Sequence, residues 1–266
     1  MKKEISKKWT VVLIFLFFAL ASSGIGIYYL WQINQTKTES YLTNPEKKSE
    51  ENKVKEQKNL VALGDSLTNA YNLSSEMTGD HSDYSFATGT QVNSFYLQLK
   101  NKGENLIPIN LAISGSKSKD LLEKQVPTAI TLNAKYITIL IGGNDVLGGV
   151  QVDQFKQNLS LAISQLKKGD TKILIAANPN ISKLKNTSYP SCQSYNLTPE
   201  MEYATQLYIE QYDQAIKDIV QKYNLTFVDL HNVLGPEDVS AFDCRHLNME
   251  GQKKLANAFI EALKSN

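Results

Sequence analysis

From residue 59 onward, short apolar runs alternate with segments in which apolar residues recur every three or four positions. The apolar runs are rich in leucine and β-branched residues, which is typical of strands buried on both faces. They predict strands at 60–63, 106–113, 135–141, 173–177 and 225–228. The periodic segments predict helices near 92–99, over 152–166, in a long stretch that Thr198 caps and Pro199 begins, and from about 248 to 263.

This alternation predicts an α/β fold. Strand-helix-strand units join parallel strands through right-handed crossovers, so we expect five parallel strands with helices on both faces. An irregular segment, 178–196, separates the last two strands. Ligands of such sheets bind beyond the carboxyl ends of the strands. Three of the predicted strands end in glycine with polar neighbours, which indicates a candidate site at that edge.

The first 33 residues differ in kind from the rest. Lysines in the first eight residues precede the run 9–33, which has no charged residue and is long enough to span a bilayer. Basic residues before the run favour a cytoplasmic N-terminus, so we expect one transmembrane helix, with the remaining chain outside the cytoplasm. The alternative is a cleaved signal peptide, since Ala19-Leu20-Ala21 fits a cleavage site and processing after Ala21 would give a secreted protein. Apolar residues that continue to Trp31 favour the uncleaved anchor.

Residues 34–58 are polar and contain little to bury, which predicts a flexible spacer between the anchor (1–33) and one globular domain (59–266). The 42% apolar content is ample for one core. Lys and Arg total 28 against 27 Asp and Glu, so no bulk charge is available to bind nucleic acid. The sequence leaves the oligomeric state open.

Ser66 follows the first predicted strand within Gly64-Asp65-Ser66-Leu67-Thr68. Glycine permits a tight turn, so the serine hydroxyl can be presented at the opening of a helix, as a nucleophile requires. The alternative is that Asp65 or Ser66 merely caps that helix. Asp65 is not expected to orient a catalytic histidine, because adjacent side chains in a turn rarely converge on one partner.

Asp243 and His246 stand three residues apart, just before the last predicted helix. Residues at this spacing on a turn can face the same side, so the carboxylate can orient the imidazole. The other two histidines, His81 and His231, are not expected to have such a partner nearby in the sequence. A solvated loop histidine is the alternative interpretation of His246.

Two further strand ends carry groups that could stabilise an oxyanion. Gly115 follows the second predicted strand, and Gly142-Gly143-Asn144 follows the third. A glycine backbone N–H and an asparagine amide are suitable donors toward the oxyanion of acyl transfer. Taken separately, these glycines could simply form turns.

Together these segments resemble the four ordered motif blocks of the SGNH hydrolase family, the GDSL-type esterases and lipases. The blocks are Gly64-Asp65-Ser66-Leu67, Gly115 preceded by Asn110, Gly142-Gly143-Asn144-Asp145, and Asp243-x-x-His246. The resemblance covers residues 59–266. It departs at Leu247, where proline often follows the family's histidine, and in the long polar stretch 77–90, which we expect to shape the substrate mouth.

The resemblance implies a three-layer α/β/α flavodoxin-like fold and a carboxylic ester hydrolase. It makes Ser66 the nucleophile, His246 the base and Asp243 the acid that orients it. The oxyanion hole would comprise the backbone N–H groups of Ser66 and Gly115 and the amide of Asn144. No metal or organic cofactor is implied. We expect the substrate to be a small-molecule, lipid or glycan ester, such as a lysophospholipid, a short-acyl ester or an acetylated carbohydrate.

The residues bear on three alternatives to an SGNH esterase. A metal-dependent phosphoesterase is disfavoured, because three histidines without a His-x-x-x-His pair make a thin ligand set. The α/β-hydrolase pattern Gly-x-Ser-x-Gly fails, because residue 68 is threonine. The remaining alternative is a catalytically silent wall- or glycan-binding module on the same fold.

Cys192 and Cys244 are the only cysteines of the chain. An even pair outside the cytoplasm can form a disulfide, which here would tie the irregular segment to the loop that contains Asp243 and His246. Two free thiols are the equally open alternative, since the sequence does not place the two cysteines within bonding distance.

Overall fold

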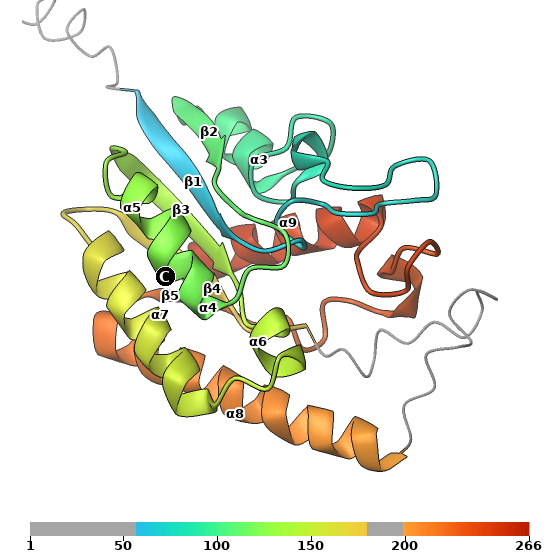
Figure 1. Ribbon diagram of the computed structural model, residues 1–266. Coiled ribbons are helices and arrows are strands. Elements are labelled where there is room, and N and C mark those ends of the chain that lie inside the picture. The colour runs from blue at the N-terminus through green and yellow to red at the C-terminus, as the bar shows by residue number, and fades with distance from the viewer. Residues whose placement is uncertain (1–56, 180–198, 266) are drawn as a thin grey trace, which may run out of the picture. The chain divides into compact units, whose positions relative to one another are not determined.

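The computed structural model describes residues 57–179 and 199–265. Its five strands form one parallel sheet in the order β2-β1-β3-β4-β5 (Figure 1). They are β1 (Lys58–Gly64), β2 (Leu106–Asn110), β3 (Ala134–Leu140), β4 (Lys172–Ala176) and β5 (Thr226–Val228). This order is the flavodoxin-like one, in which β2 lies on one side of β1 and the later strands, β3 to β5, follow on the other side. The predicted five-stranded parallel α/β fold is confirmed.

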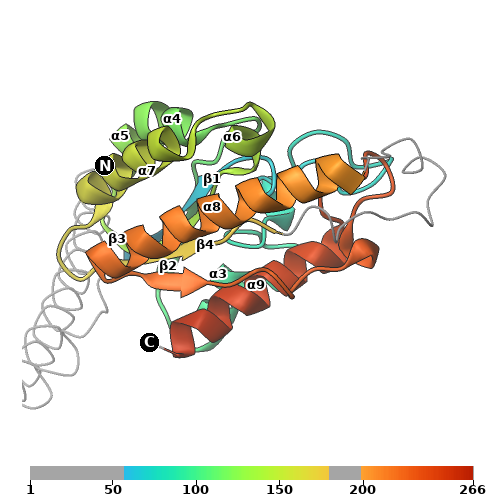
Figure 2. The ribbon, with the colours of Figure 1, turned by 90° about the horizontal axis from the view of Figure 1, so that it is seen from below.

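Helices cover both faces of the sheet (Figure 2). In β1, Leu60 and Ala62 belong to the apolar cluster of one face, and Val61 and Leu63 to that of the other, because successive side chains of a strand alternate. The helices α3 (Phe95–Asn101) and α9 (Met249–Lys264) cover the first face, and α7 (Val152–Leu166) and α8 (Pro199–Tyr223) cover the second. Burial of both clusters supplies the main stabilisation of the fold.

The predicted helix 152–166 is confirmed as α7 without a shift in its bounds. Its buried residues recur at helical spacing and form one stripe, which includes Phe155, Leu159 and Ile163. At the other end of the chain, the Asn248 side chain accepts hydrogen bonds from the backbone of Glu250 and Gly251 and so caps α9. That cap fixes where the last loop ends and the helix begins.

One helical segment between β2 and β3 was not predicted. It consists of α4 (Ser118–Asp120), the π-helical turn η2 (Leu121–Gln125) and α5 (Val126–Ala129). Pro127 lies at the start of α5, and proline removes a backbone donor and displaces the carbonyl four residues earlier. A local π-turn accommodates that defect. Because proline is unfavourable inside a helix, the sequence did not indicate a helix here.

The remaining short helices are α6 (Gly143–Leu147) and the 3₁₀ turns η1 (Ser82–Tyr84) and η5 (Pro236–Asp238). Among the described residues, no helix combines the length and the apolar character that crossing a membrane requires. The predicted transmembrane run, 9–33, lies outside those residues, as does almost all of the predicted spacer 34–58.

Candidate active site

Ser66 follows the carboxyl end of β1, which lies between β2 and β3 in the sheet, in a tight turn that begins at Gly64. Gly64 has φ +154°, and a Cβ there would lie 2.3 Å from Thr68 Oγ1 and 2.4 Å from the Leu140 carbonyl oxygen. Only glycine fits this approach between β1 and β3. Asp65 Oδ1 accepts the backbone N–H of Leu67 at 3.0 Å, so Asp65 is the residue that caps the turn. Residues 66–72 form hydrogen-bonded turns rather than the expected helix.

Two buried glutamine side chains fix this turn from opposite faces of the sheet. Gln125 accepts the Gly64 N–H at 2.9 Å and donates to the Gly64 carbonyl at 2.7 Å. Gln252, on α9, donates to the Leu67 carbonyl at 3.0 Å and accepts the Phe86 N–H at 2.8 Å. The backbone on both sides of Ser66 is therefore bonded to distant elements. Nothing in the sequence pattern indicated either contact.

The loop between η5 and α9 presents Asp243 and His246. A bridge between Val239 and Leu247 and a 2.7 Å hydrogen bond from Ser240 N to the His246 carbonyl close the loop at its base. Leu247, the residue that departs from the family motif, is 1% exposed and packs in the core. The loop is thus anchored to the sheet by the residue next to His246.

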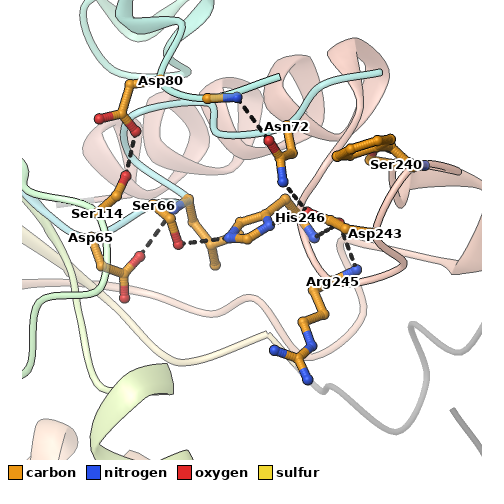
Figure 3. Close-up of polar contacts among 12 residues, drawn as sticks. Asp65, Ser66, Asn72, Asp80, Ser114, Ser240, Asp243, Arg245 and His246 are labelled. Carbon is orange, nitrogen blue, oxygen red and sulfur yellow. Dashed lines mark hydrogen bonds and ion pairs between the residues drawn. The ribbon is translucent and has the colours of Figure 1, made fainter. Parts of the chain in front are cut away.

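Ser66, His246 and Asp243 lie in a hydrogen-bonded row (Figure 3). The Ser66 Oγ is 2.8 Å from His246 Nε2, and His246 Nδ1 is 2.6 Å from Asp243 Oδ2. Because a carboxylate can only accept, Nδ1 donates to Asp243 and Nε2 of the neutral ring accepts from the serine hydroxyl. Both distances are in the range required of a nucleophile and its base. The three predicted residues come together although Ser66 and His246 are 180 positions apart.

Two carboxylates of the site have opposite electrostatic environments. Burial alone would raise the pKa of Asp243, but hydrogen bonds from His246 and Asn72 hold that pKa well below its usual range. Asp243 Oδ1 also accepts the backbone N–H groups of Arg245 and His246, each at 3.0 Å. Burial raises the pKa of Asp65 to about 6, although the Leu67 N–H and the nearby His246 act against the shift. Asp243 therefore stays ionised beside the imidazole, as a carboxylate that orients a base must.

Asn144 lies between the Ser66 turn and the segment after β2. Its Nδ2 is 3.1 Å from the Ser116 carbonyl and 3.4 Å from Asp65 Oδ2. Gly115, with φ +82°, precedes Ser116 in a turn closed by the Ser116 N–H and the Ile113 carbonyl, at 3.0 Å. The structure thus places the Asn144 amide beside the residues that adjoin Ser66 and Gly115.

The region around the predicted stretch 77–90 contacts the site at two points that were not predicted. Asn72 Nδ2 donates to Asp243 Oδ2 at 2.7 Å, and Asn72 also bonds to Gly79. On the other side of Ser66, the Ser114 hydroxyl bonds to Asp80 (Figure 3). This stretch therefore lies against the site, where it was expected to shape the substrate mouth.

The expectation that His231 lacks a nearby carboxylate partner was wrong. His231 Nδ1 is 2.8 Å from Asp229 Oδ1, and Nε2 is 3.0 Å from Asp213 Oδ2 on α8. Asp229 is two residues before His231 and directly follows β5. In the turn after a strand, an aspartate side chain can bond to the residue two positions on. This group follows β5, so it belongs to a different part of the sheet edge from Ser66.

Cys244 is disulfide-bonded and lies between Asp243 and His246 with φ +57°. Cys192, the other end of the predicted bridge, lies outside the described residues. A crosslink at Cys244 restrains the loop that contains the carboxylate and the imidazole.

Comparison with known proteins gives one family and many related folds. Residues 62–254 match the model of the GDSL-like Lipase/Acylhydrolase family. The crystal structure of TesA is 22% identical, with a TM-score of 0.57, over 78% of this chain and 98% of that chain. The psychrotrophic esterase EstA from Pseudoalteromonas sp. is 17% identical, with a TM-score of 0.57, over 78% and 97%. Axe2, an acetylxylan esterase from Geobacillus stearothermophilus, is 20% identical, with a TM-score of 0.53, over 77% and 94%. At these identities the likeness shows the fold alone. No curated protein sequence matches the chain.

Proposed function

Because the chain belongs to the GDSL-like lipase/acylhydrolase family, we propose that it is a serine esterase in which Ser66 is the nucleophile, His246 the general base and Asp243 the orienting acid. The observation that carries the proposal is the 2.8 Å contact between Ser66 Oγ and His246 Nε2, with Asp243 on the opposite ring nitrogen. This row has the geometry of nucleophile, base and orienting carboxylate that acyl transfer uses.

In the first half of the reaction, the Ser66 hydroxyl attacks the ester carbonyl carbon while His246 Nε2 takes its proton. The carbonyl oxygen becomes an oxyanion, toward which the backbone N–H groups of Ser66 and Gly115 donate. The Asn144 amide also donates to it, in exchange for its long 3.4 Å contact with Asp65 Oδ2. Such donors stabilise charge that develops only in the transition state. The imidazolium then gives its proton to the leaving alcohol, and the acyl group remains on Ser66.

In the second half, water attacks the acyl-enzyme while His246 takes a proton from the water. The imidazolium then returns that proton to Ser66 Oγ as the carboxylic acid leaves. Asp243 stays ionised throughout and stabilises the imidazolium, which agrees with the lowered pKa of its carboxyl group. Asp65 is a cap of the turn rather than a proton acceptor in this scheme, since its Oδ1 is occupied by the Leu67 N–H.

The proposal is tested by hydrolysis of p-nitrophenyl esters by the full-length protein in detergent. We expect turnover that survives strong chelation and is lost in Ser66→Ala, whose melting temperature should match that of the wild type. Retained activity in Ser66→Ala would contradict the proposed nucleophile. Absence of turnover on every ester, with intact folding, would favour the binding-module alternative.

We propose an amphipathic ester, a lysophospholipid or a short-acyl ester, ahead of an acetylated carbohydrate. Of the seven exposed large apolar side chains among the described residues, four lie within three positions of a proposed site residue: Ile113, Leu147, Phe242 and Met249. Exposed apolar side chains on the segments that carry the site residues favour an apolar ligand. In a series of p-nitrophenyl esters, turnover should be higher on butyrate or a longer acyl chain than on acetate. Turnover that is highest on acetate would favour the acetylated carbohydrate.

We also propose that residues 1–33 tether the enzyme to the membrane with its catalytic domain outside the cytoplasm. Support comes from the uncharged run 9–33 and the lysines that precede it. Ester hydrolase activity of cells that express the full chain should remain in the membrane pellet after a high-salt wash. A mature N-terminus at Ser22, found in the medium, would show that the signal-peptide alternative holds.

A further inference from the structure

Asn72 contacts the proposed triad from the region between the Ser66 turn and the stretch 77–90. Its side chain is 9% exposed, and its Nδ2 lies 2.7 Å from Asp243 Oδ2 (Figure 3). The neighbouring residue, Tyr71, packs its ring against the His246 imidazole with the ring centres 4.9 Å apart. Two consecutive residues therefore contact the two side chains that activate Ser66.

The orientation of the Asn72 amide is fixed by its second partner. Asn72 Oδ1 accepts the backbone N–H of Gly79 at 2.8 Å, and the backbone N–H of Asn72 donates to the Gly79 carbonyl at 2.9 Å. Since the amide oxygen faces an N–H donor, the NH₂ group must be the part that faces Asp243. Asn72 has φ +51°, a left-handed conformation that asparagine tolerates better than most residues.

Asp243 Oδ2 receives two donors, His246 Nδ1 at 2.6 Å and Asn72 Nδ2 at 2.7 Å. The other donors to the carboxylate, His246 Nδ1 on Oδ2 and the Arg245 and His246 N–H groups on Oδ1, belong to the same loop as Asp243. Asn72 Nδ2 comes from a distant segment, so it ties the rotation of the carboxylate about its last bond to that segment. The same rotation aims Oδ2 at the imidazole and keeps Nε2 directed at Ser66. A hydrogen bond to a buried charged group is stronger than a neutral one, and its loss changes geometry as well as energy.

We propose that Asn72 is a positioning residue of the esterase reaction, which holds Asp243 in the rotation that aligns His246 with Ser66. The inference rests on the proposed triad. Through the bonds to Gly79, it also makes the placement of the stretch 77–90 part of the catalytic geometry. The side chain acts through Asp243 and does not touch the reacting atoms.

Two substitutions separate the donor function of Asn72 from its place in the loop. Asn72→Asp keeps the shape and the oxygen that accepts from Gly79, but it removes the N–H donor and sets a second carboxylate against Asp243. Asn72→Gly removes the side chain and keeps a residue suited to positive φ. Asn224 has φ +50° and is exposed after α8, so Asn224→Asp and Asn224→Gly are matched controls.

Steady-state hydrolysis of p-nitrophenyl butyrate by the full-length variants tests the inference, with melting temperatures measured in parallel. We expect kcat of both Asn72 variants to fall about 10- to 100-fold, as the loss of a hydrogen bond to a charged group predicts, with KM changed less than about 2-fold. Both Asn224 variants should keep the wild-type kcat. A merely structural role would lower the melting temperature of Asn72→Gly and leave kcat of Asn72→Asp unchanged.

Ser66→Ala in the same assay keeps this inference distinct from the proposed function. If Ser66→Ala is inactive while Asn72→Asp has the wild-type kcat, the inference is overturned and the proposed triad stands. If the wild type shows no turnover that depends on Ser66, the proposed function fails and this inference fails with it.

Discussion

Replacing Gly64 with alanine should disrupt the turn that presents Ser66. The added Cβ would lie 2.4 Å from the Leu140 carbonyl oxygen, which belongs to the backbone of β3 and cannot rotate away. It would also lie 2.3 Å from Oγ1 of Thr68, which is fully buried. Overpacking of this kind costs about 1–3 kcal/mol, and a non-glycine residue at φ +154° adds about 1–3 kcal/mol of backbone strain. The free energy of unfolding should therefore fall by about 2–6 kcal/mol.

The Gly103→Ala variant separates the steric overlap of the added Cβ from the strain of the backbone. Gly103 also has positive φ, +84°, but a Cβ there would meet nothing within 4 Å, so only backbone strain applies. Thermal unfolding should place Gly64→Ala about 2–12 °C below Gly103→Ala. Ester hydrolysis should fall by about 100-fold in Gly64→Ala alone, because a shift of about 1 Å in Ser66 Oγ misaligns the attack. Equal melting temperatures for the two variants would refute the steric reasoning.

Two further predictions concern the carboxylates of the site. Asp243→Asn should lower kcat by about 10³- to 10⁴-fold, because an NH₂ group facing His246 Nδ1 favours the tautomer whose Nε2 cannot accept the serine proton; a loss below about tenfold would contradict the assigned role. The free energy of unfolding of Asp65→Asn, relative to that of the wild type, should increase as pH rises. The pKa of Asp65 is raised to about 6 in the folded protein, against 3.8 ordinarily. Between these values the unfolded chain releases a proton that the folded chain retains, so wild-type stability falls with rising pH. The advantage of the amide should therefore be absent below about pH 4 and reach about 3 kcal/mol above pH 6 in paired thermal melts, and a pH-independent difference would argue against it.

The strands and most long helices could be predicted, because each depends on a local pattern. The strands are runs buried on both faces, and α7 has a regular apolar stripe that includes Phe155 and Leu159. The segment from Ser118 to Ala129 escaped prediction, because Pro127 and a π-turn interrupt its period. The second run was also predicted too long, since β2 ends at Asn110 and the chain then turns toward Gly115.

The site residues could be named because four motif blocks occur in order, and each block stands at a strand end or before a helix. The residues that hold them in place could not be named, because a hydrogen bond from a side-chain amide to a distant residue does not alter the local hydrophobic pattern. Gln125 meets Gly64 across 61 positions, Asn72 meets Asp243 across 171, and Gln252 meets Leu67 across 185. The error at His231 has a different cause, since Asp229 is only two residues earlier and its contact is a local one; only the second partner, Asp213 on α8, is distant in the sequence.

Covalent labelling with a fluorophosphonate tests the central claim most directly, because such a reagent reacts with an activated serine and forms a stable adduct. The full-length protein should gain one phosphonyl group, which peptide mass spectrometry should locate on Ser66. Labelling should be abolished in Ser66→Ala and strongly slowed when His246 is replaced by alanine. A modified serine elsewhere, or equal labelling of wild type and Ser66→Ala, would contradict the account.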